Sequence, residues 1–214
     1  MDLKSKYKHV LWIGGGTDCG KTTVAAAYAK KLDVQVYHYD RYDVTHHKIL
    51  AQTDDAVREF MEASFEERWI QQTPESLLQR TLKAFHNRFP MVLSDLDKMD
   101  AKRPIIVEGF GLLPTLIAPL LTRDSQALCL VPSRKFKLES FKRRGKPSFK
   151  NHVSDPEKGW HNLFTRDMLI VELYRKEAPA YNLRLVEVDS QSEDEMLNLV
   201  ESHFAQTISR RKKR

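Results

Sequence analysis

Four residues near the start of the chain have the types and the spacing that bind a chain of phosphates. Gly15 is followed by four other residues and then by Gly20, Lys21 and Thr22, which satisfies the pattern G-x-x-x-x-G-K-[ST]. Glycines let the backbone approach a phosphate closely, and backbone N–H groups at a helix N-terminus attract an anion. The lysine would reach the β- and γ-phosphates, and the threonine hydroxyl would ligate Mg²⁺. The pattern therefore predicts a site for a nucleotide and Mg²⁺.

The neighbouring sequence gives this loop the context that a phosphate site requires. An apolar run at residues 9–13 predicts a strand before the loop, and residues 24–31 favour a helix after it. A glycine-rich turn that binds nothing is the alternative. Cys19, at the start of the helix, is either an easily oxidised thiol of lowered pKa or a passive filler. The nucleotide-binding residues that we expect are Gly15, Gly16, Thr17, Asp18, Cys19, Gly20, Lys21, Thr22 and Thr23.

Charged residues follow the second and third predicted strands, where ligands bind in an open parallel sheet. Glu108 ends the third strand and would hold Mg²⁺, or a water on it, together with Thr22. Asp40 follows the second strand and is our candidate for accepting a proton from an attacking hydroxyl. Nearby, Arg41 would clamp a polar or anionic substrate or pair with Asp43. The alternatives are a glutamate that caps a turn and an aspartate that forms one.

Three arginines are candidates for stabilising a phosphoryl group in transfer. Arg143 and Arg144 come after the fourth predicted strand, and they open a polar stretch, residues 143–160, that would form a lid. Arg166 begins the helix behind that stretch and would reach back into the same cleft. Guanidinium groups suit the several oxygens of a phosphoryl transition state. A solvated, charged surface is the alternative.

The composition describes a soluble globular protein with one domain, residues 1–208. Of the 214 residues, 41% are hydrophobic and 30% are charged. The chain shows no signal peptide and no apolar run long enough to span a bilayer, and its two cysteines fit no disulfide or metal pattern, so we expect a cytoplasmic protein. The net charge is +6, but residues 210–214 supply five of these charges. The basic tail, residues 209–214, is therefore typical of a solvated end, and nucleic-acid binding is not favoured.

Short strand-like runs alternate with helical stretches, which predicts an α/β fold with a parallel sheet and helices on both faces. The helix after the loop should span 21–32, and a helical stretch should cover 44–99, including one helix over 46–63. Within that stretch, Thr73 caps a helix that Pro90 should end. Ser154 with Glu157 reads as a capping box. The expected strands cover residues 8–13, 34–39, 104–107, 127–131 and 183–188.

The order of these motifs resembles the P-loop kinases of small molecules, the group that includes adenylate, cytidylate and uridine kinases. Two further runs look like parts of uncharacterised bacterial P-loop proteins. They are I-I-V-E-G-F-G-L-L-P-T-L-I-A-P-L-L and C-L-V-P-S-R-K-F. The resemblance implies a three-layer α/β/α fold with strand order 2-3-1-4-5, an acceptor-binding insertion at 44–99 and a lid that closes over ATP. It also implies that Gly15 to Thr23 bind ATP and Mg²⁺.

The resemblance assigns roles to the other candidates as well. Asp40 matches the acceptor-side acid, Glu108 the carboxylate of the third strand, and the arginines at 143, 144 and 166 the lid and post-lid arginines. Adenylate kinases carry an aspartate where this chain has Glu108, which favours the style of the uridine kinases. The insertion lacks a D-G-x-x-R signature for nucleoside monophosphates, so the acceptor stays open.

Three functions compete on this basis. The first is an ATP-dependent kinase for a hydroxyl of a small molecule such as a nucleoside, a metabolite or an antibiotic. The second is a nucleotide-dependent regulatory ATPase or switch. The third is a polynucleotide 5′-hydroxyl kinase, which the near-neutral body of the chain disfavours because binding a phosphate backbone needs clustered positive charge. The oligomeric state and the choice between ATP and GTP are left open.

Overall fold

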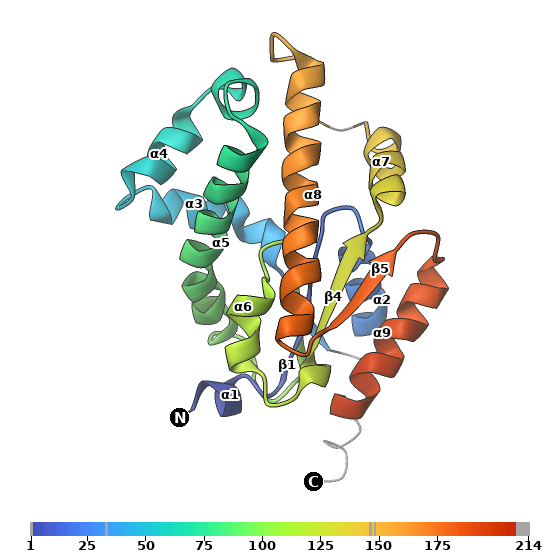
Figure 1. The fold of residues 1–214 in the computed structure, drawn as a ribbon. Coiled ribbons are helices and arrows are strands. Elements are labelled where there is room, and N and C mark those ends of the chain that lie inside the picture. The colour runs from blue at the N-terminus through green and yellow to red at the C-terminus, as the bar shows by residue number, and fades with distance from the viewer. Residues whose placement is uncertain (1, 33, 146, 148, 209–214) are drawn as a thin grey trace.

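The strands form one parallel sheet, which confirms the predicted fold class and strand order. The structure, a computed structural model, describes residues 2–32, 34–145, 147 and 149–208. Among these residues a five-stranded sheet has the order β2-β3-β1-β4-β5 (Figure 1). The strands, each within two residues of its predicted bounds, are β1 (Val10–Gly15), β2 (Gln35–His38), β3 (Ile105–Glu108), β4 (Ala127–Pro132) and β5 (Arg184–Val188).

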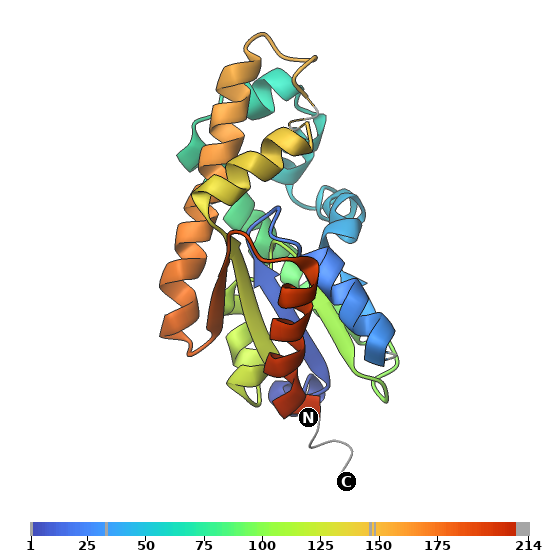
Figure 2. The ribbon, with the colours of Figure 1, turned by 90° about the vertical axis from the view of Figure 1, so that its right-hand side faces the viewer.

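Helices cover both faces of this sheet, so the molecule has three layers. One face carries α2 (Lys21–Leu32) and α9 (Glu193–Ile208), which lie side by side in front of the sheet in Figure 2. The other face carries α5 (Pro74–Leu96), α6 (Pro114–Ile117) and α8 (Pro156–Ala180). Side chains of β1 alternate between the two layers: Trp12 packs with the second group, whereas Ile13 packs with the first. Burial on both faces explains why the central strands β1, β3 and β4 are nearly continuous apolar runs.

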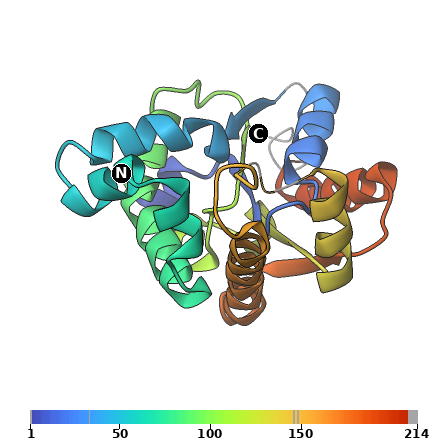
Figure 3. The ribbon, with the colours of Figure 1, turned by 90° about the horizontal axis from the view of Figure 1, so that it is seen from above.

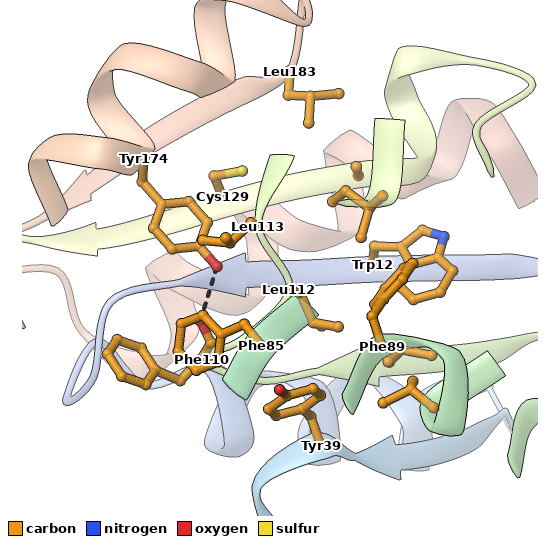
Figure 4. Close-up of a cluster of buried hydrophobic side chains, with 14 of the residues drawn as sticks. Trp12, Tyr39, Phe85, Phe89, Phe110, Leu112, Leu113, Cys129, Tyr174 and Leu183 are labelled. Carbon is orange, nitrogen blue, oxygen red and sulfur yellow. Dashed lines mark hydrogen bonds between the residues drawn. The ribbon is translucent and has the colours of Figure 1, made fainter. Parts of the chain in front are cut away.

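An aromatic core on the α5–α8 face fixes the loop that follows β3. Trp12 is fully buried and its ring lies 6.2 Å from that of Phe89 on α5. Tyr174 of α8 donates a hydrogen bond of 3.0 Å from its hydroxyl to the carbonyl oxygen of Phe110 (Figure 4). The ring of Phe110 packs edge-on against Phe85 at 5.2 Å. This core therefore anchors Phe110, two residues beyond Glu108, at the carboxyl edge of the sheet.

The segment between β2 and β3 is helical, as predicted, but it is divided differently. Two short helices replace the single helix expected over 46–63, because Asp54 accepts a hydrogen bond from Val57 N and starts a new helix there. A π-helical turn, η2, follows before α5. The elements ahead of α5 are η1 (Tyr39–Tyr42), α3 (Asp43–Leu50), α4 (Asp55–Glu62) and η2 (Glu66–Ile70).

The prediction that Pro90 ends its helix is wrong, because α5 continues through it to Leu96. Pro90 removes one backbone hydrogen bond, but it lies on the exposed face of the helix, where the freed carbonyl is not enclosed in the core. Beyond it, Val92 and Leu96 are almost completely buried. The burial of these side chains outweighs the local preference of proline to stop a helix.

Two elements flank the predicted lid, α7 (Arg134–Arg143) and α8. The capping box proposed at Ser154 is also wrong, because Asp155 caps α8 by accepting a hydrogen bond of 3.0 Å from Lys158 N. Ser154 instead donates to Glu66 of η2 through both its amide and its hydroxyl, at 2.8 and 2.5 Å. The sequence places both residues before the same proline, and the backbone angles decide which one caps.

The remaining short elements are α1 (Leu3–Lys6), η3 (Ala118–Leu120) and η4 (Asp124–Gln126). The basic tail predicted at residues 209–214 lies outside the described residues. Within the described ranges, no helix is both long enough and apolar enough to serve as a membrane span.

Candidate active site

The loop between β1 and α2 contains two glycines whose backbone conformation other residues rarely adopt. Gly15 and Gly20 have φ of 133° and 78°, in the region that side chains disfavour. A Cβ on Gly15 would lie 1.8 Å from the carbonyl oxygen of Leu130, so the site admits only glycine. Gly16 N donates to the same carbonyl at 2.9 Å, which ties the loop to β4. In Figure 3, the view from above, the loop lies between the α3–α5 insertion on one side and α7 with α9 on the other.

Lys21, the first residue of α2, turns its ammonium group back into this loop. The residue is 6% exposed, and its Nζ donates to the carbonyl oxygen of Gly16 at 2.5 Å. The ammonium group of a lysine has three N–H donors, and only one of those of Lys21 is used by a backbone carbonyl. Lys21 therefore has donors available to an anion in the loop. Cys19 is buried beside it and donates from Sγ to Gly16 O at 2.9 Å. Burial raises the pKa of the Cys19 thiol, which favours the filler interpretation over a reactive thiolate.

A short chain of hydrogen bonds joins the start of α2 to the ends of β2 and β3. Thr22 donates from Oγ1 to Glu108 Oε2 at 3.1 Å, and His38 Nδ1 lies 2.7 Å from Glu108 Oε1. Strand register brings them together, since both Ile13 of β1 and His38 of β2 pair with Glu108. The hydroxyl and the carboxylate are oxygen ligands of the kind that Mg²⁺ prefers. The described residues hold no group of three or more His, Cys, Asp or Glu placed to bind a metal, but Mg²⁺ commonly needs only one or two carboxylates.

Asp40 lies in η1, just past the end of β2, and is electrostatically coupled to this group. Desolvation by the surrounding protein raises the pKa of Asp40, although the residue keeps an exposed face. The charge of Lys21 opposes this rise, that of Glu108 adds to it, and the backbone N–H of Phe110 donates to the carboxylate. Asp40 is therefore a carboxylate at the edge of the phosphate loop with a raised proton affinity.

The two residues predicted to accompany Asp40 differ in their surroundings. Arg41 is exposed, and it forms no ion pair within the described part of the chain. Asp43 accepts from Arg88 of α5, which is 1% exposed and also donates to Tyr39 O at 3.0 Å. Burial opposes ionisation of Asp43, but the hydrogen bond from His47 and the charge of Arg88 lower its pKa overall. Asp43, at the end of η1, therefore links this turn to α5 through its ion pair with Arg88.

Arg143 and Arg144 line a pocket of about 370 Å³ beside the phosphate loop. Arg144 is half-exposed and its Nη1 lies 2.9 Å from Asp18 Oδ1, whereas Arg143 is exposed at the end of α7. The pocket lies between α2, α7 and the start of α9, so it opens next to the loop on the side away from Asp40. Its apolar lining consists of Val24, Ala27, Phe136, Val188, Met196 and Leu197.

Arg166 lies on the other side of the loop and does not join the first two arginines. Its Nη1 donates to Thr81 Oγ1 of α5 at 3.0 Å, and its guanidinium lies 5.7 and 5.8 Å from the ring centres of Phe110 and Trp69. Its Nε is 2.9 Å from Asp167 Oδ1 but is not aligned for a hydrogen bond. Arg166 therefore faces the insertion and the same Phe110 whose N–H contacts Asp40.

The sequence analysis did not identify two buried charged residues that contact the loop, Lys137 and Asp167. Lys137 of α7 is fully buried, and its Nζ contacts Thr17 and Asp18 of the loop and Asp167 of α8. A signal was present, since Lys137 lies four residues before Phe141 and shares its inward face on the helix. A lysine on such a face is a candidate for a buried ion pair.

Comparisons with known proteins identify the fold. No family model and no curated protein sequence matches the chain. A deoxyadenosine kinase from M. mycoides, solved with dCMP and dCDP, is 14% identical and has a TM-score of 0.50, over 92% of this chain and 99% of that one. A gluconokinase from Sinorhizobium meliloti (14% identity, TM-score 0.48, 95% of each chain) and a shikimate kinase from Acinetobacter baumannii (12%, 0.45, 96% and 99%) are also similar. The likeness to the deoxyadenosine kinase and the strand order show that the chain has the fold of the P-loop small-molecule kinases.

Proposed function

We propose that this chain, which has the fold of the P-loop small-molecule kinases, transfers the γ-phosphate of ATP to a hydroxyl of a small molecule. A fold alone does not fix a function, so the proposal depends on the site. The observation that carries it is the convergence of Lys21, the Thr22–Glu108 pair and Asp40 at the carboxyl ends of β1, β2 and β3. A cation, a pair of metal ligands and a carboxylate of raised pKa are the groups that phosphoryl transfer needs.

The phosphates of ATP would lie in the loop of residues 15–23. Its backbone N–H groups and the ammonium of Lys21 would bind them, and Lys21 would exchange its contact with Gly16 O for phosphate oxygens. The pocket of about 370 Å³ supports a place for the base, because its lining is mostly apolar and it adjoins the loop at Gly20 and Thr23. Arg143 and Arg144, on the rim of this pocket, would supply further positive charge to the phosphates.

Thr22 and Glu108 would hold Mg²⁺, directly or through water. When bound, the ion supplies charge neutralisation and Lewis acidity to the phosphate oxygens. His38 lies within hydrogen-bond distance of the second carboxylate oxygen of Glu108, so the carboxylate is held in one orientation before any ligand arrives.

The acceptor hydroxyl would meet Asp40 on the opposite side of the loop from the base pocket. Asp40 would accept the proton of the hydroxyl, and its raised pKa brings it closer to that of an effective general base. Arg166, with two aromatic rings at its faces, would stabilise charge on the acceptor or on the transferring group. Arg41 and Asp43, and the insertion at residues 44–99, would contact the rest of the acceptor, and residues 143–160 would cover the nucleotide.

ADP release measured with Mg²⁺–ATP tests this proposal. The assay is run alone and then with pools of nucleosides, sugars and sugar acids, aminoglycosides and oligonucleotides. Turnover that depends on one small-molecule pool supports the kinase. Turnover that no pool changes favours a regulatory ATPase, and turnover with oligonucleotides alone favours a polynucleotide kinase. No turnover and no saturable ATP binding would contradict all three.

A further inference from the structure

The phosphate loop carries a carboxylate in a place where negative charge opposes its ligand. Asp18 has φ of 65°, a left-handed conformation that usually favours glycine, and its side chain is completely buried. Its neighbours in the loop, Thr17 and Cys19, belong to the backbone that is expected to hold the phosphates. A charge of −1 this close to a triphosphate would weaken binding unless a cation neutralises it.

Lys137 supplies that cation from a different layer of the molecule. The residue is fully buried in α7, and its Nζ lies 2.9 Å from Asp18 Oδ2 and 2.6 Å from Asp167 Oδ2, with Thr17 Oγ1 as a third partner. An ammonium group has three N–H donors, so these contacts satisfy it completely. Two of the three partners are loop residues, which means that one side chain of α7 fixes both the charge and the shape of the loop.

Asp167 of α8 completes the group on the far side of Lys137. It is 3% exposed and accepts from Thr17 Oγ1 at 2.7 Å. Burial opposes its ionisation, but the charges of Arg166 and Lys137 and the hydrogen bonds from Lys137 and Thr17 outweigh this and lower the pKa of Asp167. Asp167 therefore remains charged and holds Lys137 in place, so the ammonium is not available to a ligand.

Arg144, a second cation beside Asp18, differs from Lys137 in exposure. Its side chain is 50% exposed, whereas that of Lys137 is 0% exposed. An exposed arginine can exchange Asp18 for a phosphate at little desolvation cost, but a lysine enclosed by three polar partners cannot leave. The two cations thus have different roles: Arg144 can turn to a ligand, and Lys137 must keep Asp18 neutralised when it does.

We propose that Lys137 is a positioning residue for nucleotide binding, which neutralises Asp18 and holds the phosphate loop in its anion-binding shape. The inference rests on the proposed function, because it assumes that the loop binds a triphosphate. It predicts an energetic coupling between two residues 119 positions apart, and the coupling should affect the affinity for phosphate groups more than the affinity for the base.

A double-mutant cycle tests the coupling. Lys137→Met, Asp18→Gly and the double variant are compared with the wild type by calorimetric titration with tripolyphosphate and with Mg²⁺–ATP. Glycine suits the left-handed backbone at position 18, so this variant should fold. Lys135→Met removes an exposed lysine from the same helix and is the matched control. Thermal unfolding by circular dichroism checks that every variant is folded.

We expect Lys137→Met to weaken the binding of tripolyphosphate about tenfold, within the range seen for coupled buried groups. Adding Asp18→Gly should restore affinity to within about threefold of the Asp18→Gly variant alone, since the carboxylate that Lys137 contacts is gone. Lys135→Met should bind as the wild type does.

Wild-type affinity in Lys137→Met, or equal losses with and without Asp18, would overturn the inference and leave the proposed function standing. If Lys137→Met does not fold, Asp18→Gly decides: affinity equal to or above that of the wild type supports the inference, and weaker binding overturns it. A wild type that binds neither probe would overturn the proposed function and this inference with it.

Discussion

The two sides of the phosphate loop are built in opposite ways. In the loop on the nucleotide side, the residues are contiguous in sequence, and the two charged ones are buried and have partners: Lys21 contacts Gly16 O, and Asp18 contacts Lys137. On the acceptor side, Asp40 has an exposed face, and it shares the site with Arg166 from an element more than a hundred residues away. The loop is held by contacts within the protein before any ligand arrives, whereas the second side offers polar groups that a ligand still has to engage.

This difference has a physical reason. Every nucleotide presents the same phosphates, so a fixed arrangement of amides and one ammonium serves all of them, and a local motif can encode it. An acceptor differs from enzyme to enzyme, and the groups that we propose to recognise it come from η1, the loop after β3, α5 and α8. Variants on the two sides should therefore fail in different ways, and the following predictions test this contrast.

Lys21→Met should produce the largest loss. We expect turnover to fall by about a thousandfold, because the group that faces developing phosphate charge is gone, and nucleotide binding should weaken as well. The fold should survive, since Lys21 contacts only Gly16 and Cys19 by hydrogen bonding among the described residues. Steady-state kinetics and calorimetry measure the two effects, with Lys30→Met on the exposed face of the same helix as control. Retained turnover in Lys21→Met would remove the loop from the mechanism.

Asp40→Asn should slow transfer by about a hundredfold or more while nucleotide affinity changes little, as expected for loss of a general base. The wild-type kcat should fall as pH decreases through the pKa of Asp40, because protonation removes the base. Since that pKa is raised from its ordinary value of 3.8, the fall should begin at a higher pH than for an ordinary aspartate. The variant should lack this acid limb. An unchanged pH profile in the variant would exclude Asp40, and Asp55→Asn on exposed α4 serves as control.

Arg88→Met should lower the stability of the fold more than it changes the rate of the reaction. It removes the partner of Asp43 and a hydrogen bond to Tyr39 O, and loss of such contacts costs about 1–3 kcal/mol. The pKa of Asp43 is lowered in the fold, so the contribution of the pair is present above the ordinary pKa of 3.8 and is lost as pH falls below it. Thermal unfolding should therefore separate variant and wild type at neutral pH and less so in acid. Lys83→Met, an exposed position of α5, should change the melting temperature far less.

Phe149→Leu should have the smallest effect. Although it lies within residues 143–160, its ring contacts Trp69 and Phe65 of the insertion, so we expect the effect on the acceptor side. The ring of Phe149 stacks on Trp69 of η2 at 5.2 Å with 12° between the planes, a contact that contributes about 1 kcal/mol. We expect the melting temperature to fall by a few degrees and the acceptor KM to rise modestly, with nucleotide affinity unchanged. Tyr181→Leu, exposed near the end of α8, is the control. An equal loss of nucleotide affinity would mean that the two sides are not independent.

Local pattern and composition were sufficient for much of this molecule. The alternation of strands and helices, the span of α2 and the cap of α5 by Thr73 follow from residues close together in the chain. The phosphate loop belongs to the same class, because glycine conformation and helix N-termini are local physics. The order 2-3-1-4-5 came from the resemblance to a known group, and the sheet has that order.

Only the tertiary structure decided which charges meet. Burial of Val92 and Leu96 carries α5 past Pro90, and the backbone angles at Asp155 take the cap away from Ser154. Three arginines that looked alike in sequence lie on two sides of the loop, and a lysine in the middle of α7 supplies the counterion of Asp18. Long-range ion pairs depend on where whole elements pack, and no spacing along the chain encodes the distance between α7, α8 and the loop.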